Sequence, residues 1–578
     1  MSEEATSKRH RSLRPRPRSL RWSDVSRQQV LIVLGVVVAI GFLALVPLAY
    51  LVWGTFFDQH GFTLRFFREA YGQYGLAEMG MNSLKFAVGS TLVAVTVGTV
   101  LAYLIVRTDA PLKRLMFAAS LVPLIIPGVL HTIAWIFLLS PRAGLINNMF
   151  EPLLGRPLLD IFSLGGMVLV QGLHLAPLVF LLMVAAFRSM DPALEESALM
   201  SGARLRTVFR RITLSLVKPA LFAAVLVIAV RSLESFEVPA LLGIPGGYWV
   251  FTSRIWSALD TYPSRFGQAG AYSMSLLILT SVGVYLYSRL SKRGRAFQTV
   301  TGRGFRPRPL ELGRARWLAT ALMLSYVVIS VVLPVMILVY SSTQPFFQAP
   351  SAHSLSSMSL DNYRHLFDQD LTLRALRNSF VLGVGSATSV MLLMAVASWL
   401  VVRTKMPGRW VVDNLAFLPI AIPGLVLGVS LLFVYLRSPV PIYGTLWILF
   451  IAFLTTYMPY GMRYATTSMY QISAELEESA QTSGATWWQG FRRVILPLLA
   501  PGLVAGWIFI FAASFRELSS AILIYSPGNE VISIRIWEMW RDGSTTELAA
   551  LGVIIVATLV LLAAVAHRVG ARFGIREA

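Results

Sequence analysis

The sequence predicts an all-α polytopic membrane protein in which twelve transmembrane helices form two parallel repeats of six. Its composition is the first observation, because 56% hydrophobic and 14% charged residues exclude an ordinary soluble domain. The second is a set of twelve long apolar segments, since a helix crosses a bilayer with roughly 20 apolar residues. The third is internal repetition: Asn82-Ser83 recurs as Asn378-Ser379, and Val106-Arg107-Thr108 recurs as Val402-Arg403-Thr404.

The chain begins with an Arg-rich segment, 1–28, which we expect to be a cytoplasmic tail. The first repeat, 29–290, contains predicted spans at 30–53, 84–106, 115–139, 165–187, 218–243 and 270–290. A basic cytoplasmic linker, 291–315, leads to the second repeat, 316–570, and a short cytoplasmic tail, 571–578, follows it. The spans predicted in the second repeat are 316–340, 380–402, 411–436, 444–462, 501–525 and 547–567.

The distribution of positive charge predicts the orientation in the membrane. The tail 1–28 and the segment 291–316 carry eight Lys or Arg residues each, and loop 188–218 carries six. Loops 54–80 and 140–164 carry only two each. Because cytoplasmic loops hold the excess of Lys and Arg, we expect both termini, the linker and loop 188–218 to be cytoplasmic. The net charge of +21 is thereby explained without a nucleic-acid partner.

Two matching stretches lie in the cytoplasmic loops predicted at 188–218 and 470–500. The first reads Glu195-Glu196-Ser197-Ala198 and reaches Gly202 after three more residues. The second reads Glu477-Glu478-Ser479-Ala480 and reaches Gly484 at the same spacing. Acidic residues favour the first turn of a helix, and glycine ends one. We therefore expect two short helices about a Gly hinge in each loop, with small residues that allow close contact with another protein.

This pattern resembles the EAA loop of permease subunits in binding-protein-dependent ABC importers. The resemblance covers nearly the whole chain from about residue 30, and it implies two fused permease repeats with the type I importer fold. It implies that both loops are coupling helices that dock on two ATP-binding cassette subunits. The residues that match this role are Glu195, Glu196, Ala198, Gly202, Glu477, Glu478, Ala480 and Gly484. It further implies an external solute-binding protein, a bacterial-type inner membrane, no cofactor on this chain, and ATP used by the partner subunits.

Paired prolines in the third span of each repeat suggest a translocation path on the axis between the repeats. They are Pro123 and Pro127 in the first repeat, and Pro419 and Pro423 in the second. Proline kinks a helix, and in membranes such breaks are tolerated where they are buried in protein or line a cavity. Kinking for packing alone is the alternative, but the same pair in both repeats favours a path or a gate.

Charged residues in the predicted fifth spans are a second sign of a path. They are Arg231, Glu234 and Glu237 in the first repeat, and Arg516 and Glu517 in the second. A charge at mid-membrane costs about 2.5–3.5 kcal/mol on insertion scales, so such residues face a cavity or a partner. We expect Arg231 to neutralise Glu234, and Arg516 and Glu517 to pair across the repeats. Structural ion pairing and contact with substrate are both open.

The sequence contains no catalytic or metal-binding motif. None of the six lysines follows a glycine, so the Gly-Lys-Ser/Thr element of a P-loop is absent and the chain is not expected to hydrolyse ATP. Cysteine is absent, which excludes disulfides and thiolate metal sites. Two classes of function remain, the permease of an ABC importer and an ion-coupled secondary transporter whose carboxylates carry protons or Na⁺. The duplicated loops favour the importer, because a secondary transporter needs no matching docking surfaces.

Within the importers, a fused permease of twelve helices looks most like the ferric-iron uptake group, which implies iron as the substrate. The Pro-x-x-x-Pro-Gly helices also resemble spermidine/putrescine and thiamine permeases, and a phosphonate importer is a further alternative. Fe³⁺ is a hard ion suited to oxygen ligands. Its transient ligands on this chain would be Glu234, Glu237 and Glu517.

Overall fold

The computed structural model describes residues 27–572 apart from 73–74, 192, 295–308, 405 and 407. Most of the predicted N-terminal tail, most of the predicted linker and the last six residues therefore lie outside the described residues. The described chain is almost entirely helical. The only sheet within it pairs Phe57–Asp58 (β1) with Gly61–Phe62 (β2).

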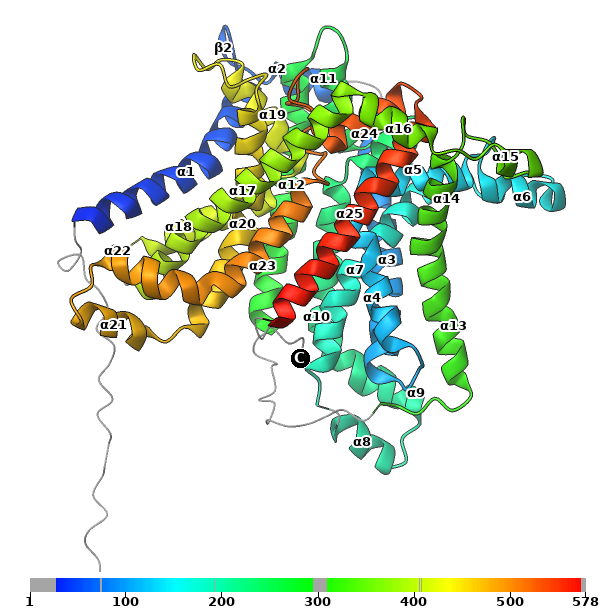
Figure 1. The fold of residues 1–578 in the computed structure, drawn as a ribbon, viewed down its shortest axis with the longest axis horizontal. Helices are drawn as coiled ribbons and strands as arrows, with labels where there is room; N and C mark the ends of the chain where they lie inside the picture. The colour runs from blue at the N-terminus through cyan, green and yellow to red at the C-terminus, as the bar shows by residue number, and fades with distance from the viewer. Residues whose placement is uncertain are drawn as a thin grey trace, which may run out of the picture.

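The helices of the first repeat are α1 (Arg27–Phe56), α2 (Arg65–Tyr71), α3 (Leu76–Arg107), α4 (Lys113–Ile125), α5 (Gly128–Leu139), α6 (Leu145–Leu154), α7 (Leu164–Arg188), α8 (Ala193–Met200), α9 (Leu205–Val208), η2 (Phe209–Thr213), α10 (Leu214–Glu234), η3 (Pro239–Gly243), α11 (Phe251–Asp260) and α12 (Phe266–Gly294). The helices of the second repeat are α13 (Ala315–Val327), η5 (Val328–Val332), α14 (Leu333–Ser342), α15 (Ala352–Ser356), α16 (Asp361–Asp368), α17 (Asp370–Arg403), α18 (Arg409–Phe417), η6 (Leu418–Ala421), α19 (Gly424–Tyr435), α20 (Leu446–Gln471), α21 (Ala474–Thr482), α22 (Trp487–Gly490), η7 (Phe491–Ile495), α23 (Leu496–Ser514), α24 (Ile532–Arg541) and α25 (Thr545–Arg572). In Figure 1, α8 and α21 lie at what we call the lower face, and α2, α11, α16 and α24 lie at the upper face.

Nine of the described helices are long and apolar enough to cross a membrane, and two bent pairs of helices raise the total to eleven. The bent pairs are α4 with α5, at 101°, and the helix 409–421 with α19, at 108°. They occupy the predicted third spans, 115–139 and 411–436, which are therefore broken in two rather than gently kinked. The remaining predicted span, 444–462, falls on α20, which is helical but is not among the eleven because its second half carries tyrosines and Arg463.

The fifth spans differ from the prediction, which placed them at 218–243 and 501–525. In the structure they run from Phe209 to Glu234 and from Trp487 to Ser514. Each begins earlier because the second helix of the Gly-hinged loop continues without a break into the membrane helix, through the π-helical turns η2 and η7. The expected short second helix is thus the start of the span. Each span also ends earlier: the first is followed by a break at Ser235 and the π-helical turn η3, and the second by a series of turns.

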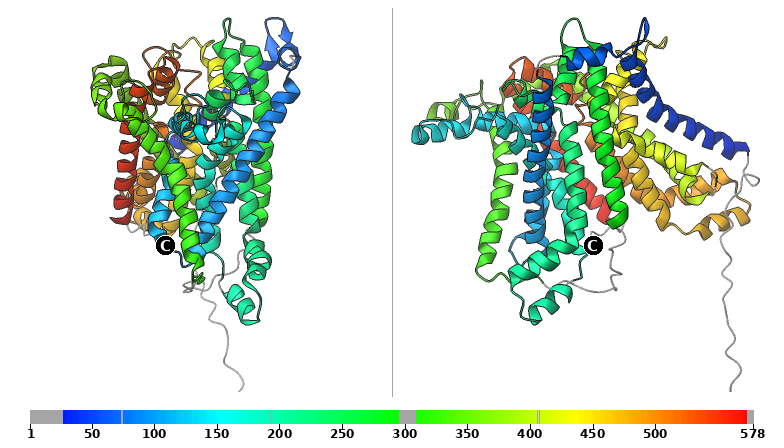
Figure 2. Two further views of the ribbon diagram at one scale, coloured as in Figure 1. Left: turned by 90° about the vertical axis from the view of Figure 1, so that its right-hand side faces the viewer. Right: turned by 180° about the vertical axis from the view of Figure 1, so that it is seen from behind.

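The first membrane helix of each repeat packs on the other repeat. Helix α1 lies against α17, α18 and α19, where a Cβ on Gly54 would come within 2.7 Å of the Phe433 ring. Helices α13 and α14 lie against α4 and α5, and Phe347, in the segment after α14, stacks on Phe137 of α5 with ring centroids 4.5 Å apart. Figures 1 and 2 show α1 and the α13–α14 helix on opposite sides of the molecule. Each repeat is therefore completed by a helix of its partner.

Within each repeat, α3 packs closely on α7, and α17 packs closely on α20. A Cβ on Gly98 of α3 would lie 2.6 Å from the carbonyl oxygen of Ala176, and one on Gly461 of α20 would lie 2.5 Å from Cγ1 of Val390. Small residues let membrane helices approach one another closely, which is a main source of their packing energy. These two pairs form a firm support for the polar residues at the boundary between the repeats.

Candidate functional site

The two Gly-hinged loops have the same backbone, and we call them the first coupling loop (193–213) and the second coupling loop (474–495). Gly202 and Gly484 adopt φ values of +81° and +82°. The amide of Ala203 donates to Ala198 at 3.0 Å, and the amide of Ala485 donates to Ala480 at 3.1 Å. A Cβ at either glycine would meet open space, so glycine is needed for its left-handed conformation rather than for room. The predicted hinge is therefore present in both loops.

The paired glutamates of each coupling loop have different surroundings. Glu196 and Glu478 are exposed, whereas Glu195 and Glu477 turn toward the body of the protein. Arg107, buried at the end of α3, pairs with Glu195, whose other oxygen accepts from the Thr213 hydroxyl at 2.5 Å. The outward glutamate is thus available to a partner, and the inward one fixes its helix to the membrane domain.

The second coupling loop is fixed by a neutral donor instead. The indole N–H of Trp399, on α17, donates to Oε1 of Glu477 at 2.8 Å. Arg403 occupies the position equivalent to Arg107, but its guanidinium donates to the carbonyl oxygens of Met469 and Ile472. The recurrence of Val-Arg-Thr in both repeats marks these arginines, although the sequence does not show which group each one binds.

The end of the linker is attached to the first coupling loop. Leu310 forms a parallel bridge with Thr108, in which the Leu310 amide donates to the carbonyl of Arg107 at 2.8 Å. The Asp109 amide donates to Leu310 at 3.1 Å, and the Leu312 amide donates to the Asp109 carboxylate at 2.9 Å. This clamp ties the start of α13, in the second repeat, to the residue that holds α8.

The predicted prolines mark the points at which the third spans break. Pro127 immediately precedes α5 and Pro423 immediately precedes α19, while Pro123 and Pro419 lie about one turn earlier. The residue before Pro127, Ile126, is extended with φ −71° and ψ 128°, as steric contact with a following proline favours. The prolines therefore produce a sharp corner in each repeat at the same position.

The glycine after each corner lies against the irregular segment that follows the fifth helix. A Cβ on Gly128 would lie 3.6 Å from Cδ of Glu237 and 3.7 Å from Nε2 of His174. A Cβ on Gly424 would lie 2.9 Å from Cβ of Ser519. The Ser519 side chain lies close to the Glu237 carboxylate, so the two corners meet across the boundary of the repeats.

Arg231 is the charged residue that joins the two repeats. Its Nη1 lies 3.2 Å from Oε2 of Glu234, which confirms the predicted pair, and its Nη2 contacts the hydroxyl of Tyr460 on α20. The Arg231 side chain remains 39% exposed although protein atoms from both repeats surround it. Arg231 thus contacts both repeats while part of its side chain stays accessible.

The predicted pairing of Arg516 and Glu517 across the repeats is not present as an ion pair among the described residues, although Glu517 lies within electrostatic range of Arg231 in the first repeat. Oε1 of Glu517 accepts from the amide and the hydroxyl of Ser520, at 3.0 and 2.9 Å, and Oε2 accepts from Tyr457 at 3.3 Å. These partners all belong to the second repeat. Because α23 ends at Ser514, Glu517 lies in a turn and caps the backbone of that turn. Nε of Arg516 has no hydrogen-bond partner among the described residues.

Three rings that the sequence did not identify close the upper face between α11 and α24, and we call them the aromatic seal. Trp256 and Trp537 are each the sixth residue of a ten-residue helix, and their ring centroids lie 5.7 Å apart. Phe236 packs on both, at 6.1 and 5.4 Å. At the ends of the same helices, Nη1 of Arg541 lies 3.4 Å from Oδ1 of Asp260. Equivalent residues of two repeats that touch each other lie on the pseudo-two-fold axis, so the seal crosses that axis.

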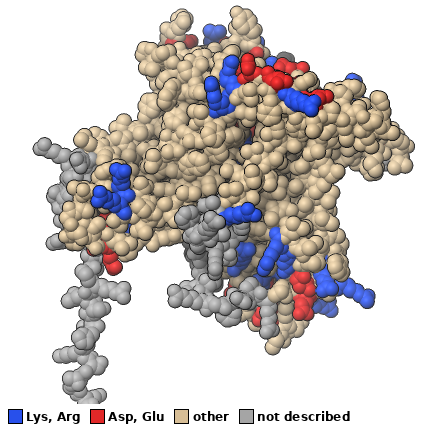
Figure 3. All heavy atoms as spheres, viewed as in Figure 1, with Lys and Arg blue, Asp and Glu red and all other residues tan. Residues whose placement is uncertain are grey.

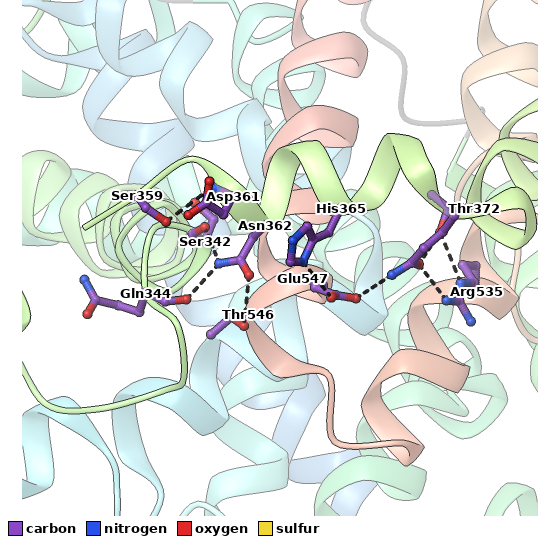
Figure 4. Close-up of polar contacts among 11 residues, drawn as sticks. Ser342, Gln344, Ser359, Asp361, Asn362, His365, Thr372, Arg535, Thr546 and Glu547 are labelled. Atoms are coloured by element: carbon purple, nitrogen blue, oxygen red, sulfur yellow. Dashed lines mark hydrogen bonds and ion pairs between the residues drawn. The ribbon is translucent and has the colours of Figure 1, made fainter. Parts of the chain in front are cut away.

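A polar network holds one half of the seal in place (Figure 4). Nη2 of Arg535, on α24, donates to Oε1 of Gln369 at 2.9 Å. Nε2 of Gln369 donates in turn to Glu547, at the start of α25, at 2.8 Å. Nδ1 of His365, on α16, lies 3.9 Å from the other oxygen of Glu547. Helix α24 is therefore fixed to α16, α17 and α25.

Two parallel repeats, a matching loop from each on one face, polar corners at their boundary and a seal on the other face define the membrane-spanning part of a transporter. The family model "Binding-protein-dependent transport system inner membrane component" matches residues 94–295 and 392–573, one match in each repeat. The chain belongs to this family and is the permease of an ABC importer, with both repeats on one polypeptide.

Several known permeases are similar to this chain. The "Fe(3+)-transport system permease protein FbpB 2" of Haemophilus influenzae is 26% identical over 81% of this chain and 85% of its own length. The "Ferric transport system permease protein FbpB" of Actinobacillus pleuropneumoniae is 22% identical over 92% of this chain and 76% of its own length. The "Putative 2-aminoethylphosphonate transport system permease protein PhnV" of Salmonella paratyphi A is 32% identical over 27% of this chain and 60% of its own length.

Proposed function

We propose that this permease carries a solute inward, driven by two ATPase subunits that dock on the first and second coupling loops. The observation that carries the proposal is the presence of two loops with one backbone on one face of the molecule (Figure 1). Each presents an outward glutamate, Glu196 or Glu478, beside a half-buried alanine, Ala198 or Ala480. This chain needs no ATPase site and no cofactor of its own, because ATP is hydrolysed by the docked subunits.

In this proposal the lower face is cytoplasmic and the upper face is external, in a bacterial-type inner membrane. The Arg-rich loop 188–218 and the start of α13 lie at the lower face, whereas α2 lies at the upper face (Figures 1 and 2). Both termini are then cytoplasmic, and the solute-binding protein docks at the upper face. Reporter fusions at Gly302 and at Ser351 should signal cytoplasm and exterior respectively. The opposite result at both positions would overturn the orientation.

The path runs along the axis between the repeats. Its external end is closed by the aromatic seal, which supports assigning this conformation to the inward-facing side of the transport cycle. Below the seal, Glu237 meets Ser519 across the axis and Arg231 meets Tyr460. These contacts join the repeats, so they must change when the repeats move apart to pass a solute.

Ferric iron is the substrate that we propose. Support comes from the two ferric transport permeases, which are similar to this chain along most of its length. The carboxylates of Glu234 and Glu237 supply oxygen atoms suited to Fe³⁺, whereas those of Glu517 already accept hydrogen bonds from their own repeat. Among the described residues, no cluster of three or more His, Asp or Glu could hold a metal ion, so any contact with iron would be transient. Thiamine, polyamine and phosphonate are the alternatives.

Uptake into proteoliposomes tests the proposal. The permease would be reconstituted with its ATPase and its binding protein, and ATP-dependent entry of radioactive Fe³⁺, thiamine, spermidine and 2-aminoethylphosphonate would be compared. Iron uptake that requires both partners is the expected result. Uptake of one of the other solutes but not of iron would show that this solute is the substrate. Uptake driven by an ion gradient without ATP would show that the transporter is ion-coupled.

A further inference from the structure

The two coupling loops differ in the turn that precedes the glycine. The first loop has Leu199 and Met200 there, and the second loop has Gln481 and Thr482 at the equivalent positions. The Met200 side chain is 89% exposed and that of Leu199 is 37% exposed. Gln481 and Thr482 are also exposed, but they are polar and are well solvated by water. An apolar pair at the tip of one loop is an exposed hydrophobic feature that the other loop lacks.

The phenylalanine at the base of the first loop is also more exposed than its equivalent in the second loop. Phe209, at the base of the first loop, is 37% exposed and lines a hollow of about 370 Å³ together with Leu310 of the linker and the apolar pair. Phe491, its equivalent in the second loop, is only 3% exposed because the Trp487 ring stacks on it with centroids 5.3 Å apart. At its base the second loop buries Phe491 and leaves Trp488 46% exposed, whereas in the first loop Phe209 adds to the accessible apolar surface of Leu199 and Met200.

The other side of α8 is also hollowed. A groove of about 420 Å³ lies between α8 and the start of the fifth span, and its apolar walls include Leu194, Ala198, Ile212 and Leu216. Helix α8 lies at the lower end of the molecule, and Figure 3 shows basic and acidic side chains gathered in that region. Charged surroundings are those of an aqueous surface, so the apolar groups of α8 face a protein partner rather than lipid.

We propose that the first coupling loop is the high-affinity anchor for an ATPase subunit and that the second coupling loop holds its ATPase subunit more weakly. This inference rests on the docking function proposed above. The occupant of the first loop is an ATPase subunit whose groove presents apolar side chains to Met200. Burial of a Met or Leu side chain at an interface strengthens binding by about tenfold or more, because apolar area is removed from water.

The attachment of the linker adds a second difference between the loops. Arg107 pairs with Glu195 through its side chain, and its carbonyl oxygen accepts from the Leu310 amide. Leu310 lies just before α13, so this bond connects the first loop to the second repeat. In the second loop Glu477 instead accepts from the indole N–H of Trp399, and the Trp399 ring packs against that of Trp487 with centroids 4.8 Å apart. A subunit anchored on the first loop is therefore connected to both repeats at once.

The test measures binding of the ATPase subunit that copurifies with the full-length permease. The permease would be placed in lipid nanodiscs and titrated without nucleotide, so that each loop binds its subunit independently. Two classes of site are expected, with dissociation constants about tenfold or more apart. Leu199→Gln with Met200→Thr should weaken the tight class by about tenfold, and Gln481→Leu with Thr482→Met should strengthen the weak class. Gln481→Asn with Thr482→Ser is the matched control and should change neither class.

The outcomes separate this inference from the docking function. Two sites of equal affinity in the unchanged protein, or a tight class that survives Leu199→Gln with Met200→Thr, would overturn the inference and leave docking intact. Binding that is insensitive to Gly202→Leu with Gly484→Leu would show that the subunit binds elsewhere, and the docking function itself would fail. Native mass spectrometry at limiting ATPase should show complexes with one subunit on the first loop.

Discussion

The aromatic seal predicts that the external end of the path opens more readily when its rings are removed. Trp256→Ala with Trp537→Ala deletes the two rings that meet at 5.7 Å on the axis. An aromatic pair contributes about 0.5–1.5 kcal/mol beyond the area that it buries. The Asp260–Arg541 ion pair remains, and since its side chains are 36% and 50% exposed it adds less than about 1 kcal/mol. A net loss of about 1–2 kcal/mol changes the ratio of closed to open molecules by about 5–30-fold.

The absence of cysteine from the chain makes this measurable. A single Ser519→Cys substitution places a thiol beside Glu237, below the seal, and a membrane-impermeant thiol reagent is added from outside. Labelling should be slow in the parent and about 5–30-fold faster when both tryptophans are alanine. Tyr262→Cys, at a side chain that is fully exposed beyond α11, should label at one rate in both backgrounds. An unchanged rate at Ser519→Cys would refute the assignment of the rings as a seal.

Three further predictions follow from the coupling loops and the polar boundary. Gly202→Leu with Gly484→Leu forces left-handed backbone on two leucines, at about 1–2 kcal/mol each, so ATP-dependent uptake should be lost while membrane abundance is kept; normal uptake would defeat the docking assignment. Glu234→Gln and Glu237→Gln should each lower uptake by about tenfold while membrane abundance is retained. Glu517→Gln weakens the hydrogen bonds to Ser520 and should lower stability by about 1–3 kcal/mol. Parallel loss of abundance and uptake in Glu234→Gln would show that the pair with Arg231 is structural. Burial raises the pKa of Glu477 above 4.5, although the Trp399 N–H and Arg403 act in the opposite direction. The folded loop therefore binds a proton more readily than the unfolded chain. The stability of the loop falls as pH rises through the raised pKa. Glu477→Gln keeps the acceptor for Trp399 and should flatten that decline in a melting-temperature profile, and an equal decline in both proteins would show that another group causes it.

Long uniform apolar segments and the duplicated loops could be predicted from the sequence because both depend on local pattern. Hydropathy finds any helix that lipid surrounds, and the spacing from Glu195 to Gly202 repeats at Glu477 to Gly484. The ends of the fifth spans could not be found in this way. Hydropathy does not mark the point where α10 stops at Glu234, since the segment after it, which includes η3, is largely buried and apolar.

The polar contacts depend on tertiary structure in a way that residue types do not show. Both repeats place an arginine at the end of the second span and a glutamate in the loop. Arg107 forms an ion pair with Glu195, whereas Glu477 accepts a hydrogen bond from Trp399 instead of pairing with Arg403. The aromatic seal has a sequence signal of its own, the recurrence of Arg-Ile-Trp at 254–256 and 535–537. A repeated short motif is informative about position on the axis only when the two copies are known to face each other.

The packing of each repeat's first helix on the other repeat affects the order in which the protein can fold during synthesis. Helix α1 ends at Phe56, but the surface on which it packs is complete only when synthesis has passed Tyr435 at the end of α19. At about 5–20 residues per second, this interval is about 20–80 s. During that time α1 can pack on α12 of its own repeat, while lipid covers the face that will meet α17, α18 and α19, and the first repeat lacks α13 and α14. Each repeat packs on a helix of the other, and fusion of the two ensures that this helix is made on the same ribosome.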